Sequence, residues 1–243
     1  HPDFGENIRE GYNAIEPGKP AEDDNGHGTL MCGVIAARNN SFGIAGVAPD
    51  VELYPVKVLD KYGEGDVSDI AEGVDWCVEK NIQVINMSFA IEKDMPLLRS
   101  AVEKAVKAGI IVVASSCNIS GGKVGYPASY EDVISVMAVD RRLKTDDYAP
   151  KGKIDFSAPG IGVLSTAGNG GYEESRGTSF AASYVTGLIA LVLQSPQKFG
   201  LPEGGDCTRD DVYNILKDFS KDLGEKGKDS TYGEGFVCFG NKK

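Results

Sequence analysis

The sequence predicts an α/β fold, doubly wound, with a mostly parallel central sheet and helices on both faces. Apolar runs with strand character alternate with helical stretches along the chain, which is the order of elements in such folds. The Val/Ile runs are nearly continuous, as in strands that are buried on both faces. No internal repeat, low-complexity tract or linker interrupts the pattern. The 243 residues are therefore expected to form one domain.

The expected elements follow in order along the chain. A helix that starts near the only internal histidine is expected at 29–37, and the helix at 67–80 carries Ile70, Val74 and Cys77 at helical spacing. Further helices are expected at 96–108 and 178–194, strands at 51–59, 84–87, 110–115 and 132–139, and loops around Lys151 and at 157–160. This alternation favours a parallel sheet.

Composition excludes several classes of function. The chain is 41% hydrophobic with a formal net charge of -11, and no Lys/Arg cluster offers the basic face that nucleic acid or an anionic membrane requires. The longest apolar stretches, at 110–114 and 187–193, are far shorter than the roughly 20 residues needed to cross a bilayer. We therefore expect no nucleic acid partner and no membrane span.

The five cysteines are an odd number, so at least one is expected to be unpaired. Buried free thiols are the simplest reading, although Cys207 and Cys238 could pair. No Cys/His set has a spacing that suits zinc or iron. The chain begins at His1 without an initiator Met or an apolar secretory segment, so a targeting signal does not define the compartment.

Three short segments carry residues with chemical potential. His27 lies between two glycines that would let the backbone approach a neighbour. Ser179 directly precedes a long helix, whose first N–H groups can bind an anion. Asn118 follows a buried strand, where α/β sheets place their ligands. Each has a plain alternative, as a structural histidine, an N-cap and a turn residue, but together they are the ingredients of acyl transfer.

Ordered motifs along nearly the whole chain resemble those of the subtilisin-like serine proteases, the subtilases of the peptidase S8 family. They are His-Pro-Asp-Phe at 1–4, Asn-Gly-His-Gly-Thr at 25–29, Asn-Asn-Ser-Phe-Gly-Ile-Ala-Gly-Val-Ala-Pro at 39–49, Val-Lys-Val-Leu-Asp at 56–60, Val-Ile-Asn-Met-Ser at 84–88, Val-Gly-Tyr-Pro-Ala at 124–128, Ser-Ala-Pro-Gly at 157–160, Gly-Thr-Ser-Phe-Ala-Ala-Ser at 177–183 and Tyr-Gly-Glu-Gly at 232–235.

The resemblance implies a serine endopeptidase that acts on peptide or protein substrates. Ser179 would be the nucleophile and His27 the general base, while Asn118 and the Ser179 N–H would bind the oxyanion. The family's orienting Asp lies before the His-Pro-Asp motif, where this chain begins, and Asp3, Asp23 and Asp24 do not match it. We therefore expect a separate fragment, from a cut precursor or another subunit, to supply a central strand and this Asp.

The resemblance also implies where the substrate binds. Two edges would take the substrate as an added strand: Gly63, Glu64 and Gly65 on one side and Ser88, Phe89 and Ala90 on the other. Gly125 would form the base of the pocket for the residue before the scissile bond. Ala90, Ile91 and Cys117 stand where the family has glycines and should narrow this pocket. Glu64 hints at basic residues further upstream, although a solvated surface charge is the simpler reading.

Other departures keep two alternatives open. Leu30 replaces a histidine that is common after His-Gly-Thr, and Ser183-Tyr184 replaces the usual Pro-His after the nucleophile. A missing proline would relax the start of the helix, which makes a peptide ligase or macrocyclase conceivable on this scaffold. A noncatalytic pseudoprotease that binds peptides or a partner is the other alternative. Hydrolysis stays the default expectation.

Calcium is the cofactor that the resemblance implies, in a structural role. Asp3 matches the family's carboxylate ligand and Asn40 its amide ligand, and the carbonyls of Arg38, Phe42 and Ile44 would complete most of the shell. An ordinary surface loop is the alternative. The compartment is not set by the sequence, and the resemblance slightly favours a secreted or cell-surface protein over a cytoplasmic one.

Overall fold

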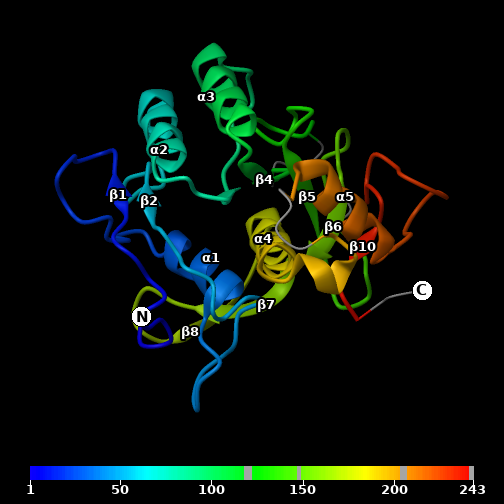
Figure 1. The fold of residues 1–243 in the computed structure, drawn as a ribbon, viewed down its shortest axis with the longest axis horizontal. Coiled ribbons are helices and arrows are strands. Elements are labelled where there is room, and N and C mark those ends of the chain that lie inside the picture. Colours follow the sequence, from blue (N-terminus) through cyan, green and yellow to red (C-terminus); the bar gives the residue numbers. More distant parts are fainter. Residues whose placement is uncertain (118–121, 147–148, 203–206, 241–243) are drawn as a thin grey trace.

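The computed structural model describes residues 1–117, 122–146, 149–202 and 207–240. Its largest sheet has six strands in the order β3–β4–β5–β6–β10–β9 (Figure 1). These are β3 (Val84–Met87), β4 (Ile111–Ser115), β5 (Ile134–Val139), β6 (Phe156–Pro159), β10 (Phe236–Val237) and β9 (Ser220–Lys221). All neighbouring pairs are parallel except β10 and β9. The predicted α/β fold with a mostly parallel central sheet is confirmed.

Helices cover both faces of this sheet. On one face α2 (Val67–Glu79) and α3 (Pro96–Lys107) pack against each other and share an apolar core with the sheet side chains. On the other face α4 (Thr178–Gln194) crosses the sheet, and α5 (Arg209–Asp218) follows a short 3-10 turn, η1 (Pro196–Phe199). Strands β4 and β5 are buried along their entire length because both faces are covered.

Two small sheets lie outside the six-stranded sheet (Figure 1). β1 (Tyr12–Asn13) pairs in parallel with β2 (Val56–Lys57), and the hairpin of β7 (Ile161–Thr166) and β8 (Tyr172–Arg176) packs against α1 (His27–Ala36). β3 ends the order of the large sheet, so one of its edges has no strand partner in the described part of the chain. Such an edge leaves backbone donors and acceptors available for a further strand.

Most expected elements are confirmed within two residues. The helices at 67–80, 96–108 and 178–194 and the strands at 84–87, 110–115 and 132–139 form as expected. The helix expected at 29–37 begins at His27, and the strand expected at 51–59 is regular only at Val56–Lys57. The loop expected at 157–160 is wrong, because Phe156–Pro159 forms β6. Ser157 and Ala158 are fully buried there, so tertiary packing overrides their turn-like character.

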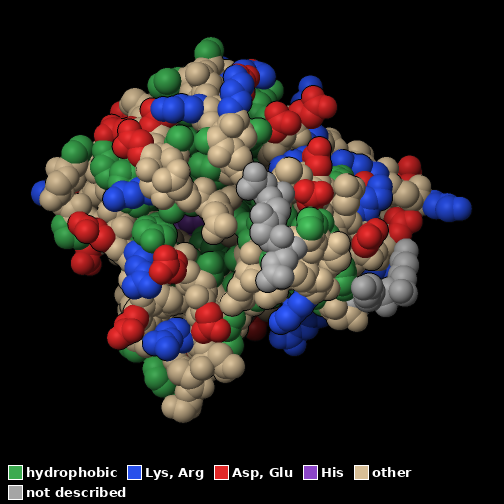
Figure 2. All heavy atoms as spheres, viewed as in Figure 1, with side chains coloured by type: hydrophobic (Ala, Val, Ile, Leu, Met, Phe, Trp, Pro, Cys, Tyr) green, Lys and Arg blue, Asp and Glu red, His purple; other side chains and the backbone are tan. Residues whose placement is uncertain are grey.

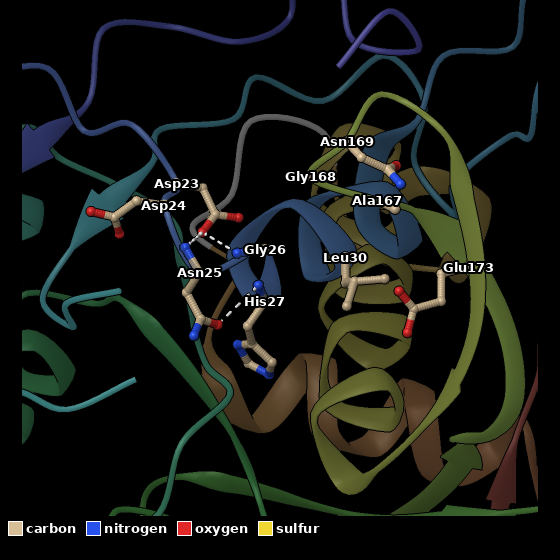
Figure 3. Close-up of a pocket in the computed structure, with 10 residues that line it drawn as sticks. All are labelled: Asp23, Asp24, Asn25, Gly26, His27, Leu30, Ala167, Gly168, Asn169 and Glu173. Carbon is tan, nitrogen blue, oxygen red and sulfur yellow. Dashed lines mark hydrogen bonds between the residues drawn. The ribbon is translucent and has the colours of Figure 1, made fainter. Parts of the chain in front are cut away.

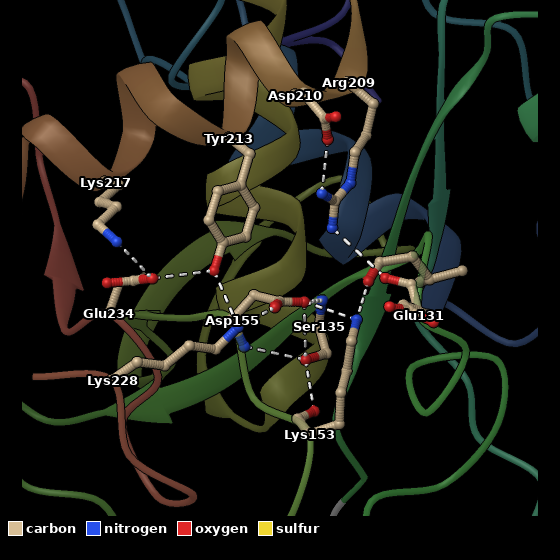
Figure 4. Close-up of polar contacts among 11 residues, drawn as sticks. Glu131, Ser135, Lys153, Asp155, Arg209, Asp210, Tyr213, Lys217, Lys228 and Glu234 are labelled. Atoms are coloured by element: carbon tan, nitrogen blue, oxygen red, sulfur yellow. Dashed lines mark hydrogen bonds and ion pairs between the residues drawn. The ribbon is translucent and has the colours of Figure 1, made fainter.

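A buried carboxylate holds the C-terminal segment against the sheet (Figure 4). Asp155 is 1% exposed and accepts hydrogen bonds from Lys153 Nζ at 2.6 Å, Lys228 Nζ at 2.9 Å and the Ser135 N–H at 2.9 Å. Lys228 also donates to the hydroxyl of Tyr213 on α5. Buried charges need such pairing, so Asp155 joins the sheet, α5 and the loop that precedes β10.

The surface carries charges of both signs (Figure 2), and the cysteines are unpaired. On the face drawn in Figure 2, Lys and Arg side chains are interspersed with Asp and Glu side chains. Among the described helices, none combines the length and the hydropathy that a bilayer span requires. All five cysteines are free thiols, Cys207 and Cys238 included. Burial raises the pKa of Cys32 and of Cys77 to about 12, so neither is a thiolate at neutral pH.

Candidate active site

His27 is the first residue of α1, and the chain enters this helix through Gly26 in a left-handed conformation, with φ of 98°. Asp23 fixes the turn by accepting hydrogen bonds from the N–H groups of Gly26 at 2.8 Å and Thr29 at 2.7 Å, and from the Thr29 hydroxyl at 2.6 Å. A carboxylate at a helix N-terminus is favourable because it meets unpaired N–H groups. Asp23 therefore shapes the backbone of the histidine turn (Figure 3).

The surroundings of His27 keep its imidazole neutral. Burial lowers the pKa of His27 below its ordinary value of 6.5, because the charged imidazolium loses water, and the nearby charge of Asp23 only partly offsets this effect. The described residues form no side-chain hydrogen bond to the ring. A neutral imidazole can accept a proton, as a general base must.

Ser179 is the second residue of α4, where backbone N–H groups have no partner within the helix. The start of the helix is held by a hydrogen bond of 2.8 Å from the Gly177 N–H to the Gly160 carbonyl. The Ser179 hydroxyl donates to the carbonyl oxygen of Ser88 at 3.1 Å, and the Ser88 hydroxyl donates to the Ser179 carbonyl at 3.1 Å. The predicted nucleophile thus directly contacts a predicted substrate-binding edge.

A polar network that the sequence analysis did not predict joins Ser88 to β3 and α4. Asn86 on β3 donates to the Ser88 hydroxyl at 2.9 Å and accepts from the Thr186 hydroxyl on α4 at 3.0 Å. Its amide also reaches Ser183 Oγ at 3.5 Å. Ser183 is fully buried, and α4 runs unbroken from Thr178. The one sequence signal was an Asn inside an otherwise apolar strand.

The third catalytic carboxylate is not among the residues that the structure describes around His27. Asp23 is engaged by the helix N-terminus, and Asp24 forms an ion pair with Lys57 Nζ at 2.6 Å. Asp3 is fully buried in another cluster, where its carboxylate contacts Asn40, Ile44 and Tyr172. Asn118, the predicted oxyanion donor, lies outside the described residues.

The expected pocket for the residue before the scissile bond is tight at its base. A Cβ placed on Gly125 would lie 2.9 Å from the Cβ of Ala90 and 3.7 Å from the Cβ of Cys117. The flanking segments are joined by paired backbone hydrogen bonds of 2.8 Å between Ile91 and Tyr126. The side chains of Ala90 and Cys117 therefore occupy space at the base of this pocket.

The other expected edge belongs to a loop that contacts the histidine turn. Asn25 Nδ2 donates to the Lys61 carbonyl at 3.1 Å, and Asp60 accepts the N–H of Glu64 at 3.0 Å. A Cβ at Gly65 would lie 2.2 Å from the Val58 carbonyl oxygen, so this position requires glycine. Gly63 has φ of 77°, and Glu64 is exposed. Asn25 therefore links this loop to the turn that carries His27.

The residues of the expected calcium loop gather around Asp3. Asn40 Nδ2 donates to Asp3 Oδ1, and the Ile44 N–H and Tyr172 hydroxyl donate to Asp3 Oδ2, each at 2.9 Å. Burial by itself would raise the pKa of Asp3, but these hydrogen bonds lower it below its usual value. Gly43 has φ of 67°, and a Cβ there would lie 2.2 Å from Asp3 Oδ2. The loop therefore wraps tightly around one carboxylate.

The donor atoms of this loop are only partly those that calcium requires. The described residues contain no group of three or more His, Cys, Asp or Glu side chains that could hold a metal ion. Asp3 brings the single carboxylate of the expected ligand set, and the Arg38 carbonyl accepts the Asn40 N–H at 3.0 Å. Rotation of the Asn40 amide by half a turn would bring an oxygen, the atom type that calcium prefers, toward Asp3, but it would break the hydrogen bond of 2.9 Å from the Phe42 N–H to Asn40 Oδ1. The donor set fits calcium only after this rotation.

Comparison with known proteins gives one consistent result. The profile of the subtilase family, Peptidase S8, matches residues 1–235. Subtilisin Savinase of Lederbergia lenta is 38% identical over 239 residues, which are 98% of this chain and 84% of that protein. Alkaline elastase YaB of Bacillus sp. is 38% identical over 232 residues, and minor extracellular protease Epr of Bacillus subtilis is 35% identical over 235. The chain spans 58% and 35% of these two relatives.

Proposed function

This chain belongs to the subtilase family of serine endopeptidases, and on that premise we propose that it hydrolyses peptide bonds with Ser179 as nucleophile and His27 as general base. The observation that carries the proposal is the Ser179 hydroxyl, which lies at the N-terminus of α4 and bonds the backbone of a substrate edge. We treat residues 1–243 as one catalytic domain of this enzyme.

The hydrogen bond to Ser88 suggests how substrate activates the site. In the structure the Ser88 carbonyl accepts the Ser179 hydroxyl at 3.1 Å. A substrate strand that added to this edge would offer its own backbone N–H to that carbonyl. The hydroxyl would then be free to turn toward His27, which takes its proton as Ser179 Oγ attacks the scissile carbonyl.

The remaining steps follow from the position of Ser179 and the acid–base role of His27. The N–H groups at the start of α4, together with Asn118, would stabilise the oxyanion of the tetrahedral intermediate. His27 then returns the proton to the leaving amine, which leaves an ester on Ser179. Water, deprotonated by the same imidazole, cleaves this ester and restores the hydroxyl.

We propose further that a segment outside this chain completes the site. Two observations support this proposal: one edge of β3 is open, and β1–β2 forms a separate sheet on which α2 packs through Val56 and Val58. A strand there would pair backbone groups that are otherwise free. An Asp at its carboxyl end would orient His27, as in the serine protease triad, where such an Asp contributes about 10⁴-fold to kcat.

Cleavage assays test this function. The chain is mixed with Val/Ile-rich peptides that end in Asp, or in Asn as the matched control, and hydrolysis of a fluorogenic peptide is followed. We expect hydrolysis with the Asp peptides, its loss in Ser179→Ala, and normal rates in Ser195→Ala at the other end of α4. Hydrolysis that persists in Ser179→Ala would refute the role of Ser179, and equal rates with Asp and Asn peptides would refute that of the added carboxylate.

We propose that the residue before the scissile bond is small. Ala90 and Cys117 place side chains against Gly125, where the family resemblance puts the base of that pocket. Alanine or serine side chains fit beside these groups, whereas a ring would overlap them. Rates for peptides that differ only at this position give the test, and a preference for Phe over Ala would contradict it.

We propose that calcium stabilises the loop around Asp3. The Asp3 carboxylate, a rotated Asn40 amide and the carbonyls of Arg38, Phe42 and Ile44 would hold the ion, which would tie the N-terminal segment to β8 through Tyr172. Calcium should raise Tm in the native chain and leave Asp3→Asn unchanged. An identical Tm in calcium and in chelator would refute the site.

Because one relative is described as an extracellular protease, we propose that this chain works outside the cell. The alternatives differ in products, since a ligase joins the acyl group to an added amine and a pseudoprotease releases nothing. Mass analysis of the products with an added amine acceptor separates these outcomes, and hydrolysis is the result we expect.

A further inference from the structure

A cavity of about 470 Å³ opens beside the predicted general base (Figure 3). Its walls come from the histidine turn and α1 on one side and from the β7–β8 hairpin on the other. Its lining includes Asp23, Asp24, His27, Leu30, Ala167 and Glu173. The volume falls in the range of small-ligand pockets and is large enough for an extended side chain.

The place of this cavity indicates which part of a substrate reaches it. None of its lining residues belongs to the edges expected to bind the substrate before the scissile bond, at 63–65 and 88–90, or to Gly125. His27 lines the cavity, and in the proposed mechanism its imidazole faces the leaving amine. Strand β8 runs directly into Gly177 and the nucleophile segment. On the histidine-turn side, the lining residue Asn25 contacts the Lys61 carbonyl of the loop that carries the 63–65 edge, so the hairpin side of the cavity is the side left to the chain that follows the scissile bond.

The carboxylates of the lining are unequal. The Asp23 carboxylate already accepts hydrogen bonds from three backbone N–H groups of the histidine turn and from the Thr29 hydroxyl. Asp24 forms an ion pair with Lys57 at 2.6 Å. Glu173 has no ion pair among the described residues. The nearest cation along β8, Arg176, is paired with Asp146 at 2.7 Å. Glu173 thus keeps its charge available to an occupant of the cavity.

Strand geometry directs Glu173 toward α1. Glu173 lies opposite Ser165 on β7, and Ser165 is fully buried and donates to the Leu30 carbonyl on α1. Directly opposite residues in an antiparallel pair point to the same face. Glu174 lies opposite Leu164, which is 51% exposed, and therefore points to solvent. Figure 3 shows the Glu173 carboxylate turned toward Leu30.

We propose that this cavity binds a lysine or arginine side chain of the substrate on the leaving-group side of the scissile bond, with Glu173 as the residue that determines this specificity. Leu30 and Ala167 give the aliphatic stem an apolar wall, and Glu173 receives the cationic end. The inference rests on the proposed endopeptidase function and adds a substrate class to it.

The test uses the chain mixed with the Asp-terminated peptide of the cleavage assay, and substrate peptides that are identical except at the first two positions after the cleaved bond. We expect kcat/KM for Lys to exceed that for Gln by about threefold at one of these positions, because Glu173 is exposed and ion pairs of exposed groups are weak. Glu173→Gln should reduce this ratio to near one, and Glu173→Lys should invert it in favour of Glu. Glu174→Gln, the adjacent residue on the solvent face, is the matched control and should keep the ratio.

The outcomes separate this inference from the function on which it rests. Cleavage at rates that do not depend on the charge after the scissile bond would overturn the inference and leave the endopeptidase standing. A Lys preference that survives Glu173→Gln would also overturn the role of Glu173. Failure to cleave any peptide, with Ser179 inert to a fluorophosphonate, would overturn both.

Discussion

At the scale of single residues, His27 connects the local structure most directly to the chemistry. Its imidazole is half-buried at the start of a helix whose first turn is fixed by Asp23, and this partial burial lowers its pKa below the ordinary value of 6.5. The unfolded chain therefore binds a proton as pH falls through 6.5, while the folded chain resists it. The free energy of unfolding should fall correspondingly below about pH 6.5.

The two histidines of the chain make this pKa measurable by NMR. We expect the His27 ring of the chain alone to titrate below 6.5. A carboxylate placed beside the ring would stabilise the imidazolium, so peptides that end in Asp should raise this pKa, and peptides that end in Asn should not. His1→Ala assigns the signals. A His27 pKa that is unmoved by the Asp peptide would contradict the proposed strand.

Ala90 offers a residue-scale test of the small pocket. Ala90→Gly removes the methyl group whose carbon lies 2.9 Å from the Cβ position of Gly125. We expect kcat/KM for Phe, relative to Ala, before the scissile bond to rise by about tenfold, because removal of a steric overlap favours the larger side chain. Ala45→Gly, at an exposed alanine, is the control. An unchanged ratio in Ala90→Gly would show that the pocket lies elsewhere.

At the scale of elements, the Asp155 cluster holds α5 and the C-terminal segment on the sheet (Figure 4). Burial alone would raise the pKa of Asp155, but the charge of Lys153 and the hydrogen bonds from Lys153, Ser135 and Lys228 lower it. This stabilisation is present above the ordinary Asp pKa of about 3.9 and is lost as pH falls from there through the lowered value.

Asp155→Asn tests the cluster by chemical denaturation. It leaves two lysines without their buried partner, so we expect a loss of about 3–5 kcal/mol in the free energy of unfolding at pH 7. The loss should shrink as pH falls below about 3.9 toward the lowered pKa of Asp155, because the unfolded chain is protonated first. Asp210→Asn, in an exposed ion pair with Arg209, should cost about 0–1 kcal/mol. Equal losses for the two variants would contradict the account.

The sequence predicted the long buried elements well because their apolar runs are local signals. The helix at 178–194 and the strand at 84–87 agree with the structure at both ends. The β7–β8 hairpin was not predicted, although Gly168, Gly170 and Gly171 mark its turn, because the polar sequence of β8 lacks an apolar period. A loop was expected at 157–160, where β6 forms. Ser157 and Ala158 adopt a strand there because elements distant in sequence bury them.

At the scale of the whole molecule, the sheet order carries the main functional consequence. Motif order indicated the nucleophile and the base, and the structure brings Ser179 against Ser88. The contact of Asn86 with Thr186 and the cavity beside Glu173 join residues far apart in sequence, so no local pattern could reveal these juxtapositions. β1 and β2 form a separate sheet, and one edge of β3 has no strand partner among the described residues.

We propose that Ser179 becomes a fully activated nucleophile when a strand with a terminal Asp joins this chain. The most direct measurement is the rate at which a fluorophosphonate labels Ser179, followed by intact mass, with Ser179→Ala as the blank. We predict slow labelling of the chain alone, and an increase of about 10³–10⁴-fold with the Asp peptide but not with the Asn peptide. Equal labelling rates with both peptides, or label on a residue other than Ser179, would contradict the account.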